Sequence, residues 1–139
     1  MADNTIISVK DLTKTFNGRA VLDHINLEVR EGEVLAIIGG SGCGKSTLLR
    51  HLVGEYLPES GSVAVLGTDY TTLKSEAGLD PVRKKIGILF QGGALYNSMT
   101  VGENVALPLR EHSNLNEHVI KIIVKMKLGD EYQQLEQFV

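Results

Sequence analysis

Two patterns of hydrophobic and polar positions run through the first forty residues. Residues 6–16 are rich in β-branched side chains and partly alternate, and residues 25–30 alternate fully between apolar and polar side chains. The Asn17-Gly18 pair between them is typical of a tight hairpin turn. Residues 34–38 are instead a continuous apolar run, which is typical of a strand buried on both faces. The pattern therefore predicts an antiparallel β unit that leads into a buried strand.

The pattern then becomes helical over residues 45–53, where apolar side chains recur every three or four positions. Two further apolar runs, residues 62–66 and residues 86–90, predict short strands. We expect the first of these to join the antiparallel unit and the second to be buried.

A last helix is predicted to end at Gly129. Asn114 followed by Glu117 three residues later is a capping-box pattern, and Pro108 is expected to break the segment before this helix. The expected apolar face of the helix consists of Leu115, Val119, Ile122 or Ile123, and Met126.

Composition limits what such a chain can be. A chain of 139 residues is normally one domain, and 14 Lys and Arg against 17 Asp and Glu give a net charge of -3, which disfavours a nucleic-acid partner. The single cysteine, Cys43, cannot form an internal disulfide, and residues 1–4 show no secretory leader pattern. No apolar run approaches the length of a membrane span. We therefore expect a cytoplasmic protein.

Between the buried strand and the first helix lies a glycine-rich segment that fits the pattern G-x-x-x-x-G-K-S/T. Backbone N–H groups approach phosphate oxygens closely where side chains are absent, and a helix N-terminus adds unpaired N–H groups. We expect Lys45 to reach the β- and γ-phosphates of a nucleotide and the Ser46 hydroxyl to ligate Mg²⁺. We call this segment the glycine loop; its residues are Gly39, Gly40, Ser41, Gly42, Cys43, Gly44, Lys45, Ser46 and Thr47.

Gln91 follows the predicted strand at residues 86–90 directly. In an open α/β sheet, the groups just beyond the carboxyl ends of the strands line the ligand crevice. The glycine loop and Gln91 are therefore expected on the same rim.

With these motifs, the chain resembles the nucleotide-binding domain of ABC transporters over nearly its whole length. Residues 12–18 look like the family's loop whose aromatic residue, here Phe16, stacks on adenine, and the glycine loop is similar to the family's Walker A motif. Gln91 falls where the family's Q-loop glutamine touches Mg²⁺ or the attacking water and reports to the transmembrane subunit. The resemblance implies ATP and Mg²⁺ as cofactors, catalytic roles for Lys45 and Gln91, and metal contacts from Ser46 and Gln91.

The resemblance also implies an α/β fold with a partial P-loop NTPase core, whose parallel sheet would be RecA-like. We expect a single incomplete ATP-binding domain over residues 1–139. An antiparallel β subdomain would occupy about residues 5–33 and 61–67, the P-loop core about 34–57 and 82–91, and the start of a helical subdomain about 92–129.

The sequence of residues 89–112 resembles that of the ATPase subunits of phospholipid importers of the Mla, toluene-tolerance and Mce type. The implied partners are a transmembrane permease, a second copy of the ATPase and, indirectly, a periplasmic lipid-binding protein. Residues 92–103 would lie near the surface that receives the permease. The implied location is the cytoplasmic face of the inner membrane.

Three parts of the family's hydrolysis machinery do not occur in these 139 residues: the Leu-Ser-Gly-Gly-Gln signature, a Walker B strand with its catalytic glutamate, and a switch histidine. We therefore expect the N-terminal half of such a domain, with ATP binding and little or no ATPase activity of its own, and with apolar surface left uncovered. A nucleotide-binding module without turnover is the alternative; a P-loop kinase or GTPase is disfavoured by the antiparallel leader and the lack of Asn-Lys-x-Asp. The histidines are assigned to surface or packing roles; they are His24, His51, His112 and His118.

Overall fold

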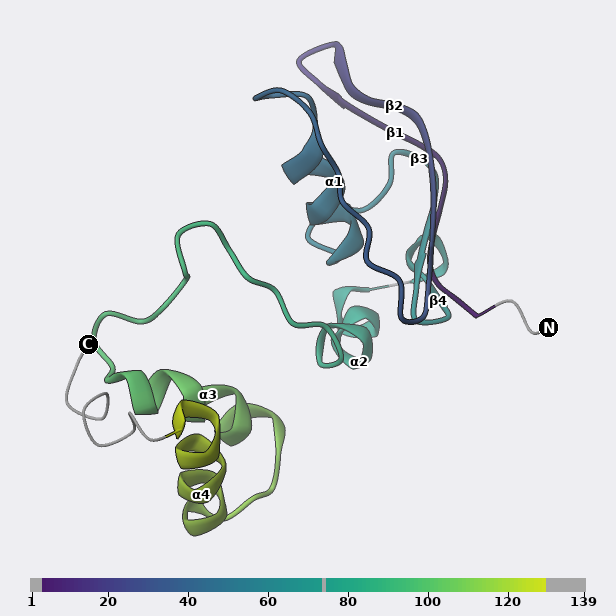
Figure 1. Cartoon of the computed structure of the whole chain (residues 1–139). Helices are drawn as coiled ribbons and strands as arrows, with labels where there is room; N and C mark the ends of the chain where they lie inside the picture. Colours follow the sequence, from purple (N-terminus) through teal and green to yellow (C-terminus); the bar gives the residue numbers. More distant parts are fainter. Residues whose placement is uncertain (1–3, 74, 130–139) are drawn as a thin grey trace. The chain divides into compact units, whose positions relative to one another are not determined.

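The computed structural model describes residues 4–73 and 75–129. The chain divides into two compact units, one that ends at Gly87 and one that begins at Ile88 (Figure 1). The first unit contains an antiparallel sheet and the helix that follows the glycine loop. The second unit contains a pair of helices.

Four antiparallel strands form the sheet of the first unit in the order β2-β1-β3-β4. They are β1 (Thr5–Phe16), β2 (Arg19–Arg30), β3 (Ser60–Val65) and β4 (Thr68–Asp69). In the central strand, Val9 lies between Leu27 of β2 and Val63 of β3. Asn17 and Gly18, with φ of 51° and 77°, make the turn between β1 and β2, as a two-residue hairpin requires. The antiparallel unit predicted from the sequence is confirmed.

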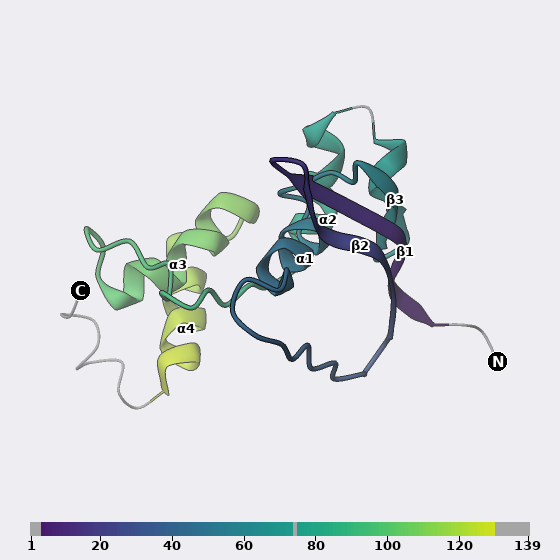
Figure 2. The same cartoon turned by 90° about the horizontal axis from the view of Figure 1, so that it is seen from above.

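Helix α1 (Lys45–Leu52) lies beside this sheet (Figure 2) and buries Leu48 and His51. Two hydrogen bonds connect the end of α1 to the segment that follows β4. Tyr70 Oη donates to the Leu52 carbonyl at 2.9 Å, and the Arg83 guanidinium donates to the Gly54 carbonyl at 2.7 Å. The short elements after β4 are η1 (Tyr70–Thr72), η2 (Glu76–Leu79) and α2 (Asp80–Arg83). The buried core consists of Val9, Leu12, Leu22, Leu48, Val63, Val65, Tyr70, Leu79 and Val82.

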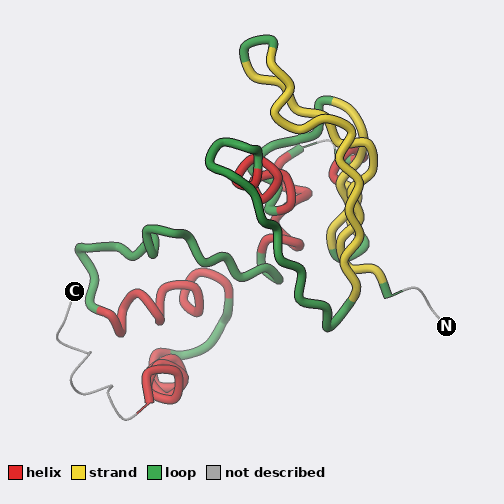
Figure 3. The backbone as a smooth tube through the Cα atoms, turned by 45° about the horizontal axis from the view of Figure 1, so that its top comes forward, coloured by secondary structure: helices red, strands yellow, loops and turns green. Residues whose placement is uncertain are grey.

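Residues 34–38 do not form the buried strand that the sequence predicts. The chain is a loop from residue 33 to residue 40 (Figure 3), and the side chains of Val34 and Ile38 are 95% and 93% exposed. Residues 86–90 likewise form no strand, and Leu89 is 90% exposed. A strand needs a neighbour to pair its backbone N–H and C=O groups, and no described segment pairs with either run. The α/β class is confirmed, whereas the prediction of parallel strands is wrong for the described residues.

The second unit pairs α3 (Val101–His112) with α4 (Glu117–Leu128). Helix α3 begins with a capping box: Thr100 Oγ1 accepts from the Glu103 N–H at 3.2 Å, and the Glu103 carboxylate accepts from the Thr100 N–H at 2.8 Å. The helix continues through Pro108, so the predicted break is wrong. Proline removes a single backbone donor, and packing of the flanking residues Ala106 and Leu109 against α4 holds the helix together.

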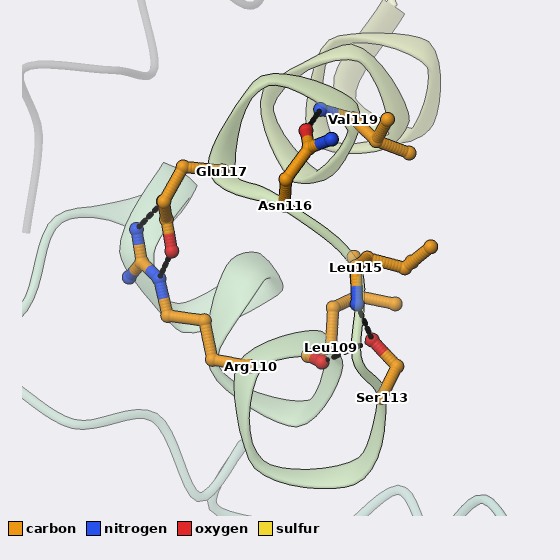
Figure 4. Close-up of polar contacts among 7 residues, drawn as sticks. All are labelled: Leu109, Arg110, Ser113, Leu115, Asn116, Glu117 and Val119. Atoms are coloured by element: carbon orange, nitrogen blue, oxygen red, sulfur yellow. Dashed lines mark hydrogen bonds and ion pairs between the residues drawn. The ribbon is translucent and has the colours of Figure 1, made fainter.

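Helix α4 begins two residues later than predicted. The Asn116 side chain accepts from the Val119 N–H at 3.0 Å, so Asn116 and not Asn114 is the N-cap (Figure 4). The guanidinium of Arg110 donates two bonds of 2.9 Å to the Glu117 carboxylate, which lowers the pKa of Glu117. This ion pair ties the first turn of α4 to α3.

The buried face of α4 also differs from the predicted one. Ile120 and Val124 pack on Ala106, whereas Ile122 and Met126 are exposed, the latter by 77%. Residues 120 and 124 lie on the opposite side of the helix from residues 122 and 126. The helix has apolar side chains on both sides, and its contact with α3 decides which set is buried.

None of the helices in the described residues is long and apolar enough to cross a membrane.

Candidate nucleotide-binding site

The glycine loop runs directly into the first turn of α1. Gly44 is the N-cap of the helix, with φ of +100°, and Gly42 has φ of +76°. A Cβ on Gly44 would lie 2.8 Å from the Val21 carbonyl oxygen and 3.0 Å from a methyl carbon of Leu22. Glycine is required at residue 44 both by the backbone conformation and by the close approach of β2.

Lys45 folds back over the loop that precedes it. Its Nζ donates to the carbonyl oxygens of Gly39 and Gly40, each at 2.7 Å, and lies 3.6 Å from Cys43 Sγ. The ammonium group is thereby held against the loop by neutral acceptors, with no carboxylate among these partners. A phosphate group would be a stronger partner for this charge than a carbonyl oxygen.

The Ser46 hydroxyl is exposed in the first turn of α1, one residue after Lys45. Among the described residues, no group of three or more His, Cys, Asp or Glu side chains could hold a metal ion by itself. Mg²⁺ takes few protein ligands when nucleotide phosphates supply the others, and a single exposed hydroxyl fits that demand. The donor set fits a magnesium ion that arrives with a nucleotide.

Phe16 ends β1 and is 40% exposed. Its backbone pairs with Arg19 of β2, and the following β2 residues, Val21 and Leu22, are the ones that approach Gly44. The end of the hairpin therefore lies beside the start of α1, and the predicted base-stacking residue and the glycine loop belong to one part of the first unit.

Gln91 is exposed, lies in the loop that precedes α3 and belongs to the second unit. Its predicted place at the end of a buried strand is wrong, because residues 86–90 form no strand. Its metal and catalytic roles stay predictions.

One group of contacts near Phe16 is missing from the sequence predictions. The Phe16 and Tyr56 rings lie 6.0 Å apart, and Lys14 Nζ is 5.3 Å from the centre of the Phe16 ring. The Glu59 carboxylate accepts from Lys14, and this bond, together with two from Thr15, lowers the pKa of Glu59 to about 2. These residues lie up to 45 positions apart, so no local sequence pattern could have grouped them.

A glycine loop that opens a helix, and whose lysine folds back onto its carbonyl oxygens next to an exposed serine, defines the class of P-loop nucleotide-binding proteins. Comparison with known families narrows the class. The family model described as ABC transporter matches residues 22–138, and the chain belongs to this family.

Two curated relatives illustrate the match. The intermembrane phospholipid transport system ATP-binding protein MlaF of Haemophilus influenzae is 44% identical over 126 residues, which cover 91% of this chain and 47% of the relative. A probable ribonucleotide transport ATP-binding protein, mkl of Mycobacterium leprae, is 42% identical over 122 residues, covering 88% of this chain and 35% of the relative. The chain thus spans about half the length of MlaF and about a third of mkl.

A solved structure gives the same result for the fold. The ATP-binding cassette MJ0796, in a dimeric post-hydrolysis state bound to ADP and Pi, matches with a TM-score of 0.83 and 28% sequence identity, covering 95% of this chain and 60% of the other. The predicted fold family is therefore confirmed.

Proposed function

We propose that the chain binds ATP with Mg²⁺ and is the nucleotide-binding part of an ABC transporter that moves phospholipid or a related lipid. The observation that carries the proposal is the arrangement of Lys45, which is held over the glycine loop at 2.7 Å from two carbonyl oxygens next to a helix N-terminus. A cation held by neutral acceptors at a helix start favours a phosphate ligand.

In this proposal each group has one task. The N–H groups at the start of α1 and Lys45 bind the phosphates, the Ser46 hydroxyl binds Mg²⁺, and Phe16 stacks on adenine. Magnesium supplies charge neutralisation on the phosphate oxygens when it is bound. Gln91 and the exposed residues Leu95 and Tyr96 lie within or beside residues 92–103, the proposed contact surface for the permease.

The larger assembly belongs to the same proposal. The chain would act at the cytoplasmic face of the inner membrane, with a permease, a second ATPase copy and, indirectly, a periplasmic lipid-binding protein. MJ0796 forms a dimer, which supports the second copy, and MlaF is named for phospholipid transport, which supports the cargo. Hydrolysis would occur in the complete protein, and the 139 residues alone would bind ATP with little or no turnover.

Calorimetric titration with ATP in the presence of Mg²⁺ tests the binding. Hydrogen bonds to a charged group contribute about 1.5–3 kcal/mol, so Lys45→Ala should lower the affinity for ATP at least about tenfold. Lys127→Ala, which alters an exposed lysine at the end of α4, is the matched control and should leave the affinity unchanged. Equal affinities for wild type and Lys45→Ala would contradict the proposal. A phosphate-release assay on the same samples tests turnover.

The cargo needs a separate test, because mkl is named for ribonucleotide transport and not for lipid. Proteoliposomes that contain the complete protein and the permease that co-purifies with it should transfer a fluorescent phospholipid when ATP is present. ATP-dependent movement of a ribonucleotide without phospholipid transfer would show the lipid assignment to be wrong.

A further inference from the structure

Tyr56 lies in the connection between α1 and β3 and contacts side chains of both β1 and α1. Its ring centre is 6.0 Å from that of Phe16, with the ring planes tilted by 58°, and 5.6 Å from that of His51, with the planes at 73°. Both are favourable geometries for aromatic rings. Tyr56 therefore joins the end of β1 to a buried residue of α1.

His51 fixes one side of Tyr56. Its side chain is fully buried, and its Nδ1 lies 2.8 Å from the carbonyl oxygen of Thr47, the last residue of the glycine loop. A carbonyl oxygen accepts only, so Nδ1 carries the proton and Nε2 is left with a lone pair that has no hydrogen-bond partner among the described residues. Burial lowers the pKa of His51, which keeps the ring neutral in this orientation.

Arg50 fixes the hydroxyl of Tyr56. Its guanidinium donates to Tyr56 Oη at 2.8 Å, lies 5.5 Å from the ring centre, and is 3.6 Å from the Glu55 carboxylate. A tyrosine ring held both at its edge and at its hydroxyl has little rotational freedom. It forms a fixed surface for whatever packs on it.

Phe16 is the residue that packs on this surface. It ends a strand next to a two-residue turn and is partly exposed, so its own strand restricts its ring only weakly. Tyr56 and the ammonium group of Lys14, 5.3 Å from the Phe16 ring centre and held by Glu59, supply the restriction. These two contacts restrict the Phe16 ring.

We infer that Tyr56 is a positioning residue for the nucleobase: it holds the Phe16 ring in the orientation in which a purine stacks on it. The inference rests on the proposed function, because it takes Phe16 as the base-stacking residue. Tyr56 acts through Phe16, and the contact chain from Thr47 through His51 to Tyr56 links the phosphate end of the site to its base end. Fixing the ring in advance avoids an ordering cost on binding.

The test separates base binding from phosphate binding by titrating each variant with MgATP and with magnesium tripolyphosphate, which has no base. Tyr56→Leu removes the aromatic ring. We expect it to weaken ATP binding about three- to tenfold, which corresponds to the interaction free energy of one aromatic pair, and to leave the affinity for tripolyphosphate unchanged. Tyr56→Phe keeps the ring and should retain the affinity for ATP within about twofold. Ile122→Ala, which alters an exposed apolar side chain of α4, is the control and should change neither affinity.

A double variant shows whether Tyr56 acts through Phe16. If it does, Phe16→Ala combined with Tyr56→Leu binds ATP no more weakly than Phe16→Ala alone. Additive losses would overturn the inference, since they mean that Tyr56 acts independently of Phe16. Equal weakening of ATP and tripolyphosphate by Tyr56→Leu would also overturn it, because that result is the mark of a general structural role.

A measurement on the unaltered fold covers the case in which Tyr56→Leu does not fold. In protein labelled with fluorotyrosine and assigned with Tyr56→Phe, the ¹⁹F signal of Tyr56 should shift with ATP and stay in place with tripolyphosphate. A signal that ignores ATP overturns the inference. The proposed function fails in a different way: wild-type protein would then bind ATP no more tightly than tripolyphosphate, or Phe16→Ala would have no effect on ATP.

Discussion

The Glu59 carboxylate accepts two hydrogen bonds from Thr15, one from the backbone N–H at 3.0 Å and one from the hydroxyl at 2.9 Å. Glu59 lies in the connection between α1 and β3, and Thr15 lies near the end of β1, so these bonds tie the two segments together. The ammonium group of Lys14 adds an ion pair. The ion pair with Lys14 and the bonds from Thr15 lower the pKa of Glu59 to about 2.

This lowered pKa makes the first unit sensitive to acid. A carboxyl group whose pKa is lower in the folded than in the unfolded state stabilises the fold fully above the unfolded pKa, here about 4.5, and loses this effect as the pH falls towards about 2. Between these pH values, we expect the melting temperature of Glu59→Gln to decrease less than that of the wild type. Thermal unfolding followed by circular dichroism measures this decrease. Glu28→Gln, which removes an exposed carboxylate on β2, is the control. An unchanged pH profile in Glu59→Gln would contradict the prediction.

Gly61 and Gly67 offer a matched pair for stability. Both have φ of +79°, but a Cβ on Gly61 would lie 2.3 Å from the Lys10 carbonyl oxygen, whereas a Cβ on Gly67 would have nothing within 4 Å. Gly67→Ala should cost about 1–2 kcal/mol of unfolding free energy from backbone strain alone. Gly61→Ala should cost at least about 3 kcal/mol, because β1 must move as well. Urea titrations measure both, and equal losses would show that steric overlap with β1 is not limiting.

The start of α4 distinguishes the observed cap from the one that the sequence pattern favours. Asn116→Ala should destabilise the second unit by about 1 kcal/mol, because the Val119 N–H loses its acceptor. Asn114→Ala should be nearly neutral. Urea unfolding followed at the helical band of the circular dichroism spectrum compares the two, and a larger loss for Asn114→Ala would place the cap at that residue instead.

The magnesium role of Ser46 has a metal-removal test. In the wild type, chelation of Mg²⁺ should lower the affinity for ATP, because the metal neutralises phosphate charge. Ser46→Ala should lose most of this dependence and bind ATP in Mg²⁺ about as weakly as the wild type does after chelation. Ser75→Ala, at an exposed serine outside the glycine loop whose side chain makes no cap bond to η2, is the control and should keep the full magnesium effect. If Ser46→Ala retains the full magnesium effect, the metal is held by other groups.

The parts of the fold that the sequence predicts correctly depend on neighbouring residues. The β1–β2 hairpin follows from alternation and from the Asn17-Gly18 turn, and the start of α1 follows from the fixed spacing of Gly44 and Lys45. In each case the residues that determine the conformation lie within a few positions of one another. A local pattern is sufficient there.

The wrong predictions concern features that depend on distant partners. Residues 34–38 have a strand's composition, but a strand forms only when a neighbour supplies hydrogen bonds. Ile122 and Ile120 are equally apolar, and only the contact with α3 buries Ile120. No local sequence pattern marks Tyr56 as a site residue, because its proposed role depends on the ring of Phe16, 40 positions earlier in the chain.

Amide hydrogen exchange in the unpaired loop at residues 34–38 can report on strand pairing there. Backbone N–H groups outside secondary structure exchange with deuterated water quickly, whereas those in a paired strand are protected. Any polypeptide that adds a strand beside residues 34–38 would convert fast-exchanging amides into slow ones, at positions flanking the glycine loop. Peptide-resolved deuterium uptake over residues 34–38 would therefore record when such a strand is added, without a label or an activity assay.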